Sequence, residues 1–496
     1  MIKQKFFLDF SSKTLHHIFQ AIGGIVVARY AGPTIVGTIA YGAAFVGIFN
    51  FINGLLGPAH VKIISETNNE GACNTTFSIL KILFITIFIF FSISAYLISK
   101  YYFNTIFTTD KEWIIFISIL VIVLQNIILI PQGIFIAKMQ QARLNIPYLI
   151  QGILYNSIRS IIAILGFGAV ILSSIPIFVS IILIPFYIYL LKDIPFSNFN
   201  WNIAKRYFII SQPIFIIVIC NTASINVSRL ILEYYTSTLV LGLFIAGNNI
   251  AGILGLISGT AGSLFYPLFS KSVAEKNNNK IQKYIKNYAR LVFMWIYPIV
   301  IFLCLFSDNI ILSILGQDYL VSSEVFKIII FSSFLQMLAI PFGNLLFSYN
   351  KFNLAAFISI LKFVLQITIV LICVHPSMLN YGVISLAIAI LFTELFIFFI
   401  RYYYSNKIIN LSLVKDNILY FLYGLSIYFL YILFLIPYSN KYFINQFSIM
   451  ITYFFVHYSI MILLGMINKN DFTLLKNIVS YKKMKMYIQN ELNSNK

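Results

Sequence analysis

Glycine spacing is the feature that most constrains what this chain can fold into. The glycines between residues 36 and 58 all recur 205 residues later, although glycine makes up only 24 of the 496 residues. The matched positions are Gly37, Gly42, Gly47, Gly54 and Gly57, with Gly242, Gly247, Gly252, Gly259 and Gly262. Chance does not readily produce five matches from five. We infer that one structural unit is present twice.

The duplicated unit ends in the same way in both copies. Pro58 and Glu66 reappear 209 residues later as Pro267 and Glu275, and each glutamate opens the pattern Glu-X-Asn-Asn. A long apolar segment therefore reaches a proline and enters a short polar loop, twice.

The composition excludes a soluble globular protein. Hydrophobic residues make up 60% of the chain and charged residues 10%, with a mean hydropathy of +0.90. Apolar runs of about 20 residues match the length of helix that crosses a bilayer. Alternation with a period of two residues is missing, so we expect helices and not a barrel.

We expect about fourteen membrane-spanning helices. They are placed at 12–30, 35–57, 77–99, 113–137, 147–171, 174–191, 207–230, 237–265, 288–315, 322–348, 354–374, 380–400, 417–436 and 445–467. The repeat equates the second span with the eighth, and an offset of six helices, which is even, restores the direction of the chain. The prediction is an all-α polytopic membrane protein with two parallel six-helix lobes around a central cavity. Residues 1–200 and 201–410 form the lobes, and 411–496 form an extra helix pair with a basic tail.

Basic residues give the orientation. If the N-terminus lies inside, most of the 34 lysines and arginines fall at inward ends. The outward ends carry Arg29, Lys100, Lys111, Arg229, Lys327 and Lys441. The net charge of +19 therefore indicates cytoplasmic loops and termini, and not nucleic-acid binding. The four cysteines show no paired spacing, so we expect neither a metal site nor a disulfide.

One segment resembles a known family. Ala28-Arg29-Tyr30-Ala31-Gly32-Pro33, followed by Gly37 and Tyr41, resembles the junction of the first two helices in Wzx-type O-antigen flippases of the multidrug/oligosaccharidyl-lipid/polysaccharide exporter superfamily. The second copy differs, since Glu233-Tyr234-Tyr235 replaces the Gly-Pro turn.

The resemblance implies two six-helix lobes around a central cavity. It also implies transport of an undecaprenyl-pyrophosphate-linked oligosaccharide from the inner to the outer leaflet of the bacterial cytoplasmic membrane, by alternating access. The expected partners are this lipid-linked substrate, membrane lipids and the polysaccharide polymerase machinery, with no cofactor.

Arg159 is the first candidate for substrate binding. It falls near the middle of the fifth predicted span, where an unpaired arginine costs about 2.5–3.5 kcal/mol on insertion scales. Gln151, Tyr155 and Asn156 give the same helix a polar side. The guanidinium could bind a pyrophosphate through two hydrogen bonds, or it could tie helices together through carbonyl groups.

Lys362 and Glu394 also lie inside predicted spans. Lys362 is close to the repeat equivalent of Arg159, and two cations at similar depth would suit a dianion. Alternatively, Lys362 forms a buried ion pair with Glu394, which could titrate in a proton-coupled cycle or only neutralise the lysine.

Two further helices carry polar stripes. Lys13, His17, Gln20 and Gly24 share one face of the first span, which either receives a lipid head group or anchors the helix end at the interface. In the seventh span Thr222, Asn226 and Arg229 share a face. The cavity-lining candidates are therefore Arg159, Lys362, His17, Gln20, Asn226 and Tyr155.

Arg29 and Arg229 lie near equivalent outer helix ends. They are either paired gate residues or helix caps, because a helix C-terminus favours a cation. With Glu394 they complete the gate and coupling candidates.

Two other functions compete with the flippase. A multidrug extruder of the same superfamily would need intramembrane carboxylates for cationic drugs, and the spans offer little besides Glu394. A membrane polymerase or acyltransferase would need a convergent acid and base set or a sizeable outer loop. Neither is evident, so we do not expect an enzyme.

Overall fold

The structure is a computed structural model that describes residues 2–67, 69–102, 108–138, 140–410, 454–455 and 458–459. Every regular element within these residues is helical, and nine of their helices are long and apolar enough to cross a membrane. This confirms the predicted all-α membrane class. The predicted spans at 417–436 and 445–467 lie outside the described residues, apart from short pieces such as Phe454, whose ring lies 5.7 Å from that of Phe302.

The first half of the chain forms one group of helices. Its elements are α1 (Ile2–Gly47), η1 (Ile48–Asn50), α2 (Phe51–Gly54), α3 (Leu56–Glu66), α4 (Glu70–Tyr102), α5 (Thr109–Ala137), α6 (Gln141–Ile164) and α7 (Ala169–Leu190). The second half begins with α8 (Trp201–Tyr235), α9 (Thr238–Ala251), α10 (Ile253–Ala274) and α11 (Asn278–Leu291). It continues with η3 (Val292–Ile296, a π-helical turn), α12 (Tyr297–Leu305), α13 (Ser307–Ile314), η4 (Gln317–Tyr319), α14 (Ser322–Ser348), α15 (Phe352–Val374), η5 (Gly382–Ile384) and α16 (Ser385–Ile409).

Helix α1 joins two predicted spans. It runs through Gly32, whose φ of +82° is a conformation that glycine adopts without a steric penalty, and Pro33 follows directly. The predicted helices at 12–30 and 35–57 therefore meet at a sharp bend, and the apolar segment Ser11–Asn50 counts as one candidate span. Helix α6, with its polar residues, is not among the nine. The predicted span at 237–265 is also divided at Gly252 into α9 and α10, and α9 is too short to count as a span. These three differences lower the number of candidate spans relative to the prediction.

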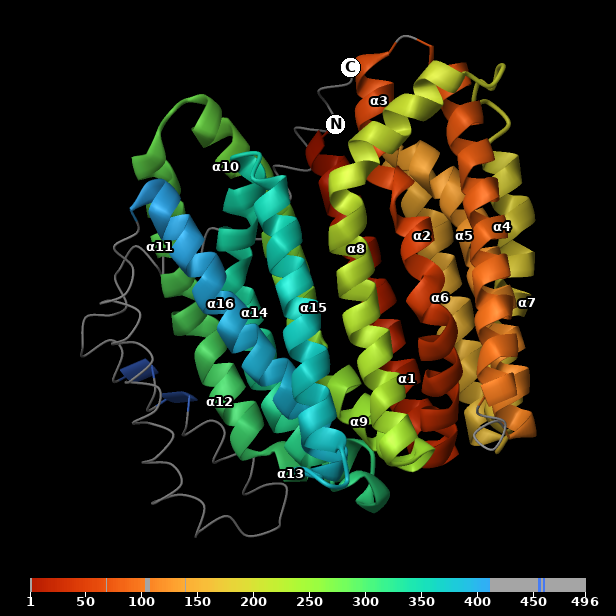
Figure 1. Cartoon of the computed structure of the whole chain (residues 1–496), viewed down its shortest axis with the longest axis vertical. Helices are drawn as coiled ribbons and strands as arrows, with labels where there is room; N and C mark the ends of the chain where they lie inside the picture. Colours follow the sequence, from red (N-terminus) through yellow and green to blue (C-terminus); the bar gives the residue numbers. More distant parts are fainter. Residues whose placement is uncertain are drawn as a thin grey trace.

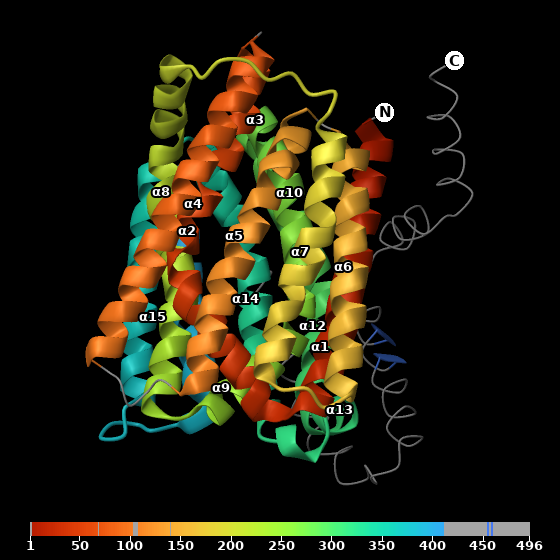
Figure 2. The same ribbon diagram turned by 90° about the vertical axis from the view of Figure 1, so that its right-hand side faces the viewer.

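Neighbouring helices pack in the same order in both halves. In the first half α1 packs on α6, α5 on α7, and α6 on α7. In the second half α8 packs on α15, α14 on α16, and α15 on α16. Figure 2 shows α4, α5, α7 and α6 along one side of the first group. The packing thus follows the duplication that the glycines indicate.

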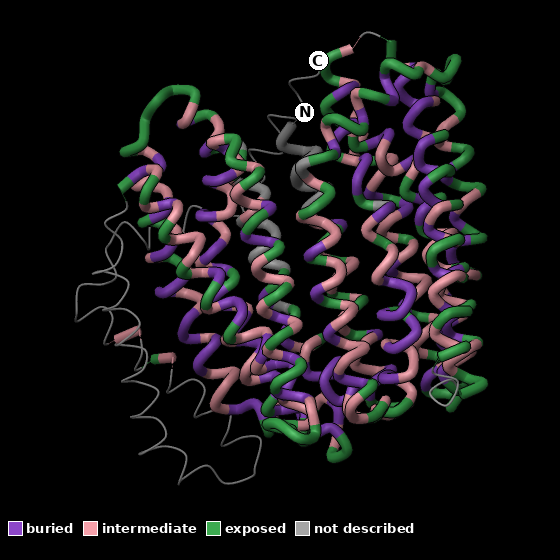
Figure 3. The backbone as a smooth tube through the Cα atoms, viewed as in Figure 1, coloured by how far each residue is buried: buried purple, intermediate pink, exposed green. Residues whose placement is uncertain are grey.

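The two groups lie apart at one end and together at the other (Figure 1). They separate towards α3 and α10, and they meet near α9 and α13. We call these the inner end and the outer end, after the orientation that the basic residues predict. Buried residues run along the facing sides of the helices and across the region where the groups meet (Figure 3).

Candidate functional site

Two glycines at the outer end bring the backbones of the two halves into close contact. A Cβ atom on Gly37 of α1 would lie 1.8 Å from the carbonyl oxygen of Thr238 on α9. A Cβ on Gly242 of α9 would lie 1.8 Å from the carbonyl oxygen of Pro33. Only glycine lets the backbones approach so closely. The first pair of the repeat is therefore the seam between the halves.

The next two pairs also have equivalent positions. Gly42 lies against Ile114 in α5, and Gly247 lies against Ser322 at the start of α14, which is the equivalent helix. At Gly47 the α-helix gives way to η1, and at Gly252 helix α9 gives way to α10. The repeat thus preserves close contacts and helix breaks, which explains why glycine recurs.

Arg159 lies on the face of α6 that packs against α1. The predicted span 147–171 ends at Ile164 in the structure, so Arg159 lies five residues before the outer end of α6 and not near the middle of the helix. The His16 ring stacks on that of Tyr148 at 4.1 Å, and Asn156 fills the space beside Gly23. Arg159 follows three residues after Asn156, so it shares this face. Its guanidinium lies 5.6 Å from the centre of the Tyr155 ring, and the described residues place no carboxylate in an ion pair with it. Most of its hydrogen-bond donors are therefore free for an anion.

Lys362 forms the ion pair that the sequence offered as one alternative. Its Nζ lies 2.5 Å from Oε1 of Glu394, whose side chain is 4% exposed. Both members of the pair belong to the second half, so Lys362 is neutralised in this conformation.

The helix packing shows that Lys362 and Arg159 do not occupy equivalent positions in the two halves. Gln366 on α15 donates to the Ser224 carbonyl (3.3 Å) and to the Ser228 hydroxyl (3.2 Å) of α8. Asn156 makes the equivalent approach to α1 at Gly23, and Gly23 and Ser228 are separated by the same 205 residues as the glycines. Lys362, four residues before Gln366, therefore corresponds to a position near Gly152, about two turns from Arg159.

The remaining cavity candidates lie on α1, α6 and α8. Nδ1 of His17 lies 3.2 Å from Oε1 of Gln20, and the Gln20 side chain is exposed. Asn226 donates to the Thr222 carbonyl at 2.9 Å, and its amide oxygen fills the space beside Gly47. Asn226 is thus placed in the packing between the halves.

The two gate candidates differ. Arg29 donates to the backbone carbonyl of Ser313 in α13 at 3.3 Å, so it links the first half to the second. Beside it the Tyr319 hydroxyl donates to the Ala28 carbonyl at 2.8 Å. That carbonyl belongs to the last turn before the bend at Gly32, where backbone acceptors lose their helical partners. Arg229 is half-buried, and the described residues give it no ion pair.

One outer contact was not anticipated from the sequence. Lys111, in the first turn of α5, forms an ion pair with Glu233, in the last turn of α8. The Lys111 ammonium also lies 4.7 Å from the centre of the Tyr41 ring. Both charged residues were noted as features of outward helix ends, and nothing in their spacing pairs them across 122 positions.

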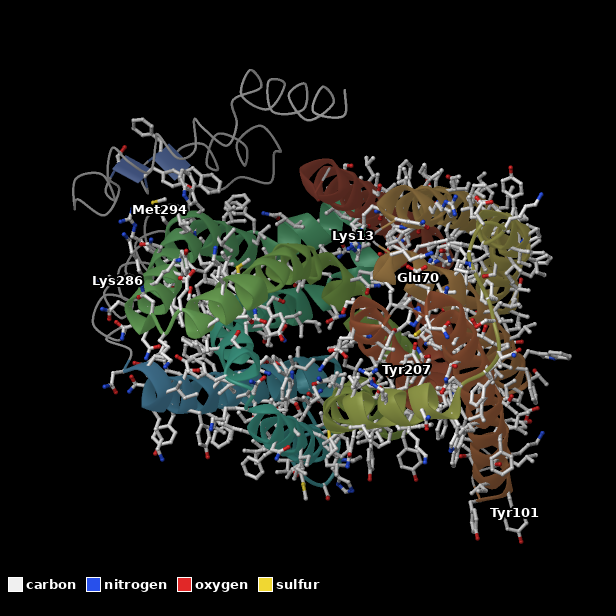
Figure 4. The ribbon with its side chains drawn as sticks, turned by 90° about the horizontal axis from the view of Figure 1, so that it is seen from above. Lys13, Glu70, Tyr101, Tyr207, Lys286 and Met294 are labelled. Carbon is white, nitrogen blue, oxygen red and sulfur yellow. The ribbon has the colours of Figure 1, made fainter. Side chains whose placement is uncertain are left out.

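The inner part of α8 contacts the first half of the chain. Arg206 pairs with Glu66 at 2.6 Å, and the Tyr207 hydroxyl lies 2.6 Å from Nδ1 of His60. Figure 4, seen from the inner end, places Tyr207 in the same group of helices as Glu70, away from Lys286. His60 is fully buried in α3, and burial lowers its pKa to about 3.

Solved structures with a similar fold are transporters. A lipid II flippase, MurJ, in an inward closed conformation matches with a TM-score of 0.70 at 16% identity, over 91% of this chain and 98% of that one. A multidrug-resistance MATE transporter in an inward-facing conformation matches with a TM-score of 0.65 at 14% identity, over 80% and 94%. An outward-facing MATE transporter matches with a TM-score of 0.54 at 13% identity, over 82% and 94%. No protein of curated function matches the sequence.

The sequence itself matches a family. Residues 26–324 match the family described as polysaccharide biosynthesis protein, which covers more than half of the chain. The fold resembles that of MurJ and that of a MATE transporter of the multidrug/oligosaccharidyl-lipid/polysaccharide exporter superfamily. These matches are transporters and not enzymes. The chain is therefore a multi-pass membrane protein that belongs to the polysaccharide biosynthesis protein family.

Proposed function

We propose that this protein is a flippase for an undecaprenyl-pyrophosphate-linked oligosaccharide. It moves the head group from the inner to the outer leaflet of the bacterial cytoplasmic membrane, with both chain termini in the cytoplasm. The family supplies the link to polysaccharide biosynthesis. The observation that carries the proposal is Arg159, a half-buried arginine of α6 without a carboxylate partner among the described residues.

The proposed lobes are the two helix groups, residues 1–200 and 201–410, with 411–496 as an additional helix pair. The groups meet at the outer end and separate at the inner end (Figure 1), which suits a conformation that loads substrate from the cytoplasm. Arg159 binds the pyrophosphate, because guanidinium matches two phosphate oxygens. Tyr155, His17, Gln20 and Asn226 contribute polar groups for the first sugars, while the polyprenyl chain stays in lipid.

Lys362 has a second role in this proposal. While it is paired with Glu394 its charge is neutralised, so it contributes to phosphate binding only when the pair opens. Protonation of Glu394 would open it, and that would couple transport to protons. If transport is not coupled to protons, the Lys362–Glu394 pair stays closed throughout the cycle. The two cases differ in whether a proton gradient changes the transport rate.

The membrane potential can drive the step without a coupling ion. An interior-negative potential favours outward movement of anions by about 2.3 kcal/mol per charge per 100 mV. A head group with two negative charges would gain about 4.6 kcal/mol per 100 mV. Ionophores that abolish the potential should slow flipping, and unchanged flipping would refute this source of energy.

The function can be tested in cells by identifying the lipid-linked glycan that accumulates when the protein is depleted. Depletion should leave a pyrophosphate-linked oligosaccharide on the cytoplasmic leaflet. The variants are compared at equal amounts of inserted protein. Wild type should relieve the accumulation fully, Arg159→Lys should relieve it in part, and Arg159→Ala should not relieve it. Full relief by Arg159→Ala would remove Arg159 from the site, and no accumulation upon depletion would reject the flippase.

A multidrug extruder is the second candidate, because the MATE fold also matches. A cationic drug needs a free carboxylate in the membrane, and Glu394 is already paired with Lys362. Export of cationic dyes that is unaffected by Arg159→Ala and abolished by Glu394→Gln would favour this alternative.

A further inference from the structure

The outer end holds a buried charged contact made of three side chains. Lys111 and Glu233 form an ion pair in which the lysine side chain is 11% exposed and the glutamate 5% exposed. Tyr41 of α1, also buried, presents its ring to the Lys111 ammonium at 4.7 Å. A cation against an aromatic face and a carboxylate is held from two directions. Both charged side chains are largely shielded from solvent while this contact is intact.

The contact joins the two halves of the chain. Lys111 and Tyr41 belong to α5 and α1 of the first half. The outer part of α8 is fixed to α15 of the second half, since Gln366 donates to the Ser224 carbonyl and to the Ser228 hydroxyl. This is the packing that α1 makes with α6 in the first half. Glu233 lies one to two turns beyond Ser228 on α8, so its carboxylate reaches across the seam.

Burial makes this contact sensitive to the separation of the halves. Removing one partner of a buried ion pair leaves an uncompensated charge, which is strongly unfavourable. If the outer ends separate, water reaches both groups and hydrates each charge. The Lys362–Glu394 pair differs, because both of its residues lie within the second half.

We propose that Lys111, Glu233 and Tyr41 form a latch that holds the outer end closed and that breaks when the transporter opens to the outside. The role of the latch in transport rests on the proposed function. Its effect on conformation does not, so the test measures the separation of the outer ends and not flipping.

Distances between spin labels test the latch directly. In the full chain in lipid nanodiscs, an outer pair of labels at Tyr101→Cys and Met378→Cys reports the outer ends, and both native side chains are exposed. An inner pair at Ser65→Cys and Asn279→Cys reports the inner ends, again at exposed positions. Wild type should show a narrow outer distribution.

Breaking the latch should shift the population. Lys111→Met and Glu233→Gln should each raise the ratio of outer-open to outer-closed molecules about tenfold or more. The charge exchange Lys111→Glu with Glu233→Lys should restore much of the closed population, and Tyr41→Leu should give a smaller shift.

Lys100→Met is the matched control. It breaks the pair between Lys100 and Glu112, which join at 2.8 Å at the same end but within the first half. It should leave the outer distribution unchanged. An unchanged distribution in Lys111→Met and Glu233→Gln would overturn the latch and indicate that all of α8 moves with the first half. If Lys111→Met or Glu233→Gln does not fold, the outer distances of the remaining variant and of Tyr41→Leu provide the test. If these variants shift the outer distances as expected but the wild-type protein does not flip lipid, the proposed function is rejected and the latch is retained.

Discussion

Replacing Gly37 with alanine should open the outer seam. The added Cβ would lie 1.8 Å from the Thr238 carbonyl oxygen, whereas real Cβ atoms stay at least 3.0 Å from such atoms. The two backbones must therefore move apart by at least about 1.2 Å. Overpacking of this kind costs about 1–3 kcal/mol. The cost applies only while the halves are in contact, so it weakens the closed arrangement relative to any open one.

The expected shift is large enough to measure. A cost of about 1–3 kcal/mol changes the ratio of open to closed molecules by about fivefold to more than a hundredfold. The probe is Ala44→Cys, because Ala44 is fully buried two turns from Gly37 on the same face of α1. Cys304, the least buried of the four native cysteines, is replaced by alanine. The rate at which a membrane-impermeant thiol reagent labels residue 44 from outside should rise by the same factor.

Gly57→Ala is the matched control, because nothing lies within 4 Å of a Cβ at that position. It should leave the labelling rate as in the parent protein. Gly242→Ala should act as Gly37→Ala does, since its Cβ meets the Pro33 carbonyl at the same distance. Equal labelling in Gly37→Ala and Gly57→Ala would refute the argument that the glycine crossing closes the outer end.

Three other substitutions or conditions test separate parts of the account. Arg159→Ala should lower the initial flipping rate at least about tenfold with normal membrane insertion, and a normal rate would remove Arg159 from the site. Lys362→Met should lower the free energy of unfolding by about 3 kcal/mol, because it leaves the Glu394 carboxylate buried without a partner. Lys362→Met combined with Glu394→Gln should recover most of this loss, because no unpaired charge then remains buried. A double variant no more stable than the single variant would contradict a buried ion pair. Acid should destabilise the protein through His60, whose folded pKa of about 3 lies below the unfolded value near 6.5. The unfolded chain then binds the proton first, so stability that is complete above about pH 6.5 falls by about 1.4 kcal/mol per unit as the pH drops towards 3. His60→Leu should show a smaller loss of melting temperature between pH 7.5 and 5.5 than wild type, and an equal loss would refute the assignment.

Much of the fold could be predicted because membrane helices depend on local sequence. Apolar length places each helix, and the glycine repeat relates the halves before any contact is known. The repeat also contained the seam, since Gly37 and Gly242 recur for a steric reason that acts at one crossing. The sequence shows the bend at Gly32 only as a Gly-Pro pair. The backbone conformation of Gly32, which the sequence does not give, determines whether the two predicted helices are continuous.

The site was harder to predict because it depends on which helix faces meet. Arg159 stands out because a charge inside a span is rare. The register between Arg159 and Lys362 required the packing of Asn156 and Gln366, since the repeat spacing changes from 205 at Gly57 to 209 at Pro58. Lys111 and Glu233 gave no signal, because charged residues at helix ends are common and their pairing is a tertiary contact.

Leaflet transfer in proteoliposomes tests the central claim most directly. The purified chain is reconstituted with a fluorescent oligosaccharide on a polyprenyl pyrophosphate, and a membrane-impermeant quencher reports the fraction exposed outside. We expect transfer that depends on the protein and is slowed at least about tenfold by Arg159→Ala. The same oligosaccharide on a polyprenyl chain without phosphate should not be transferred. Equal transfer of the phosphate-free lipid, or no transfer of either, would contradict it.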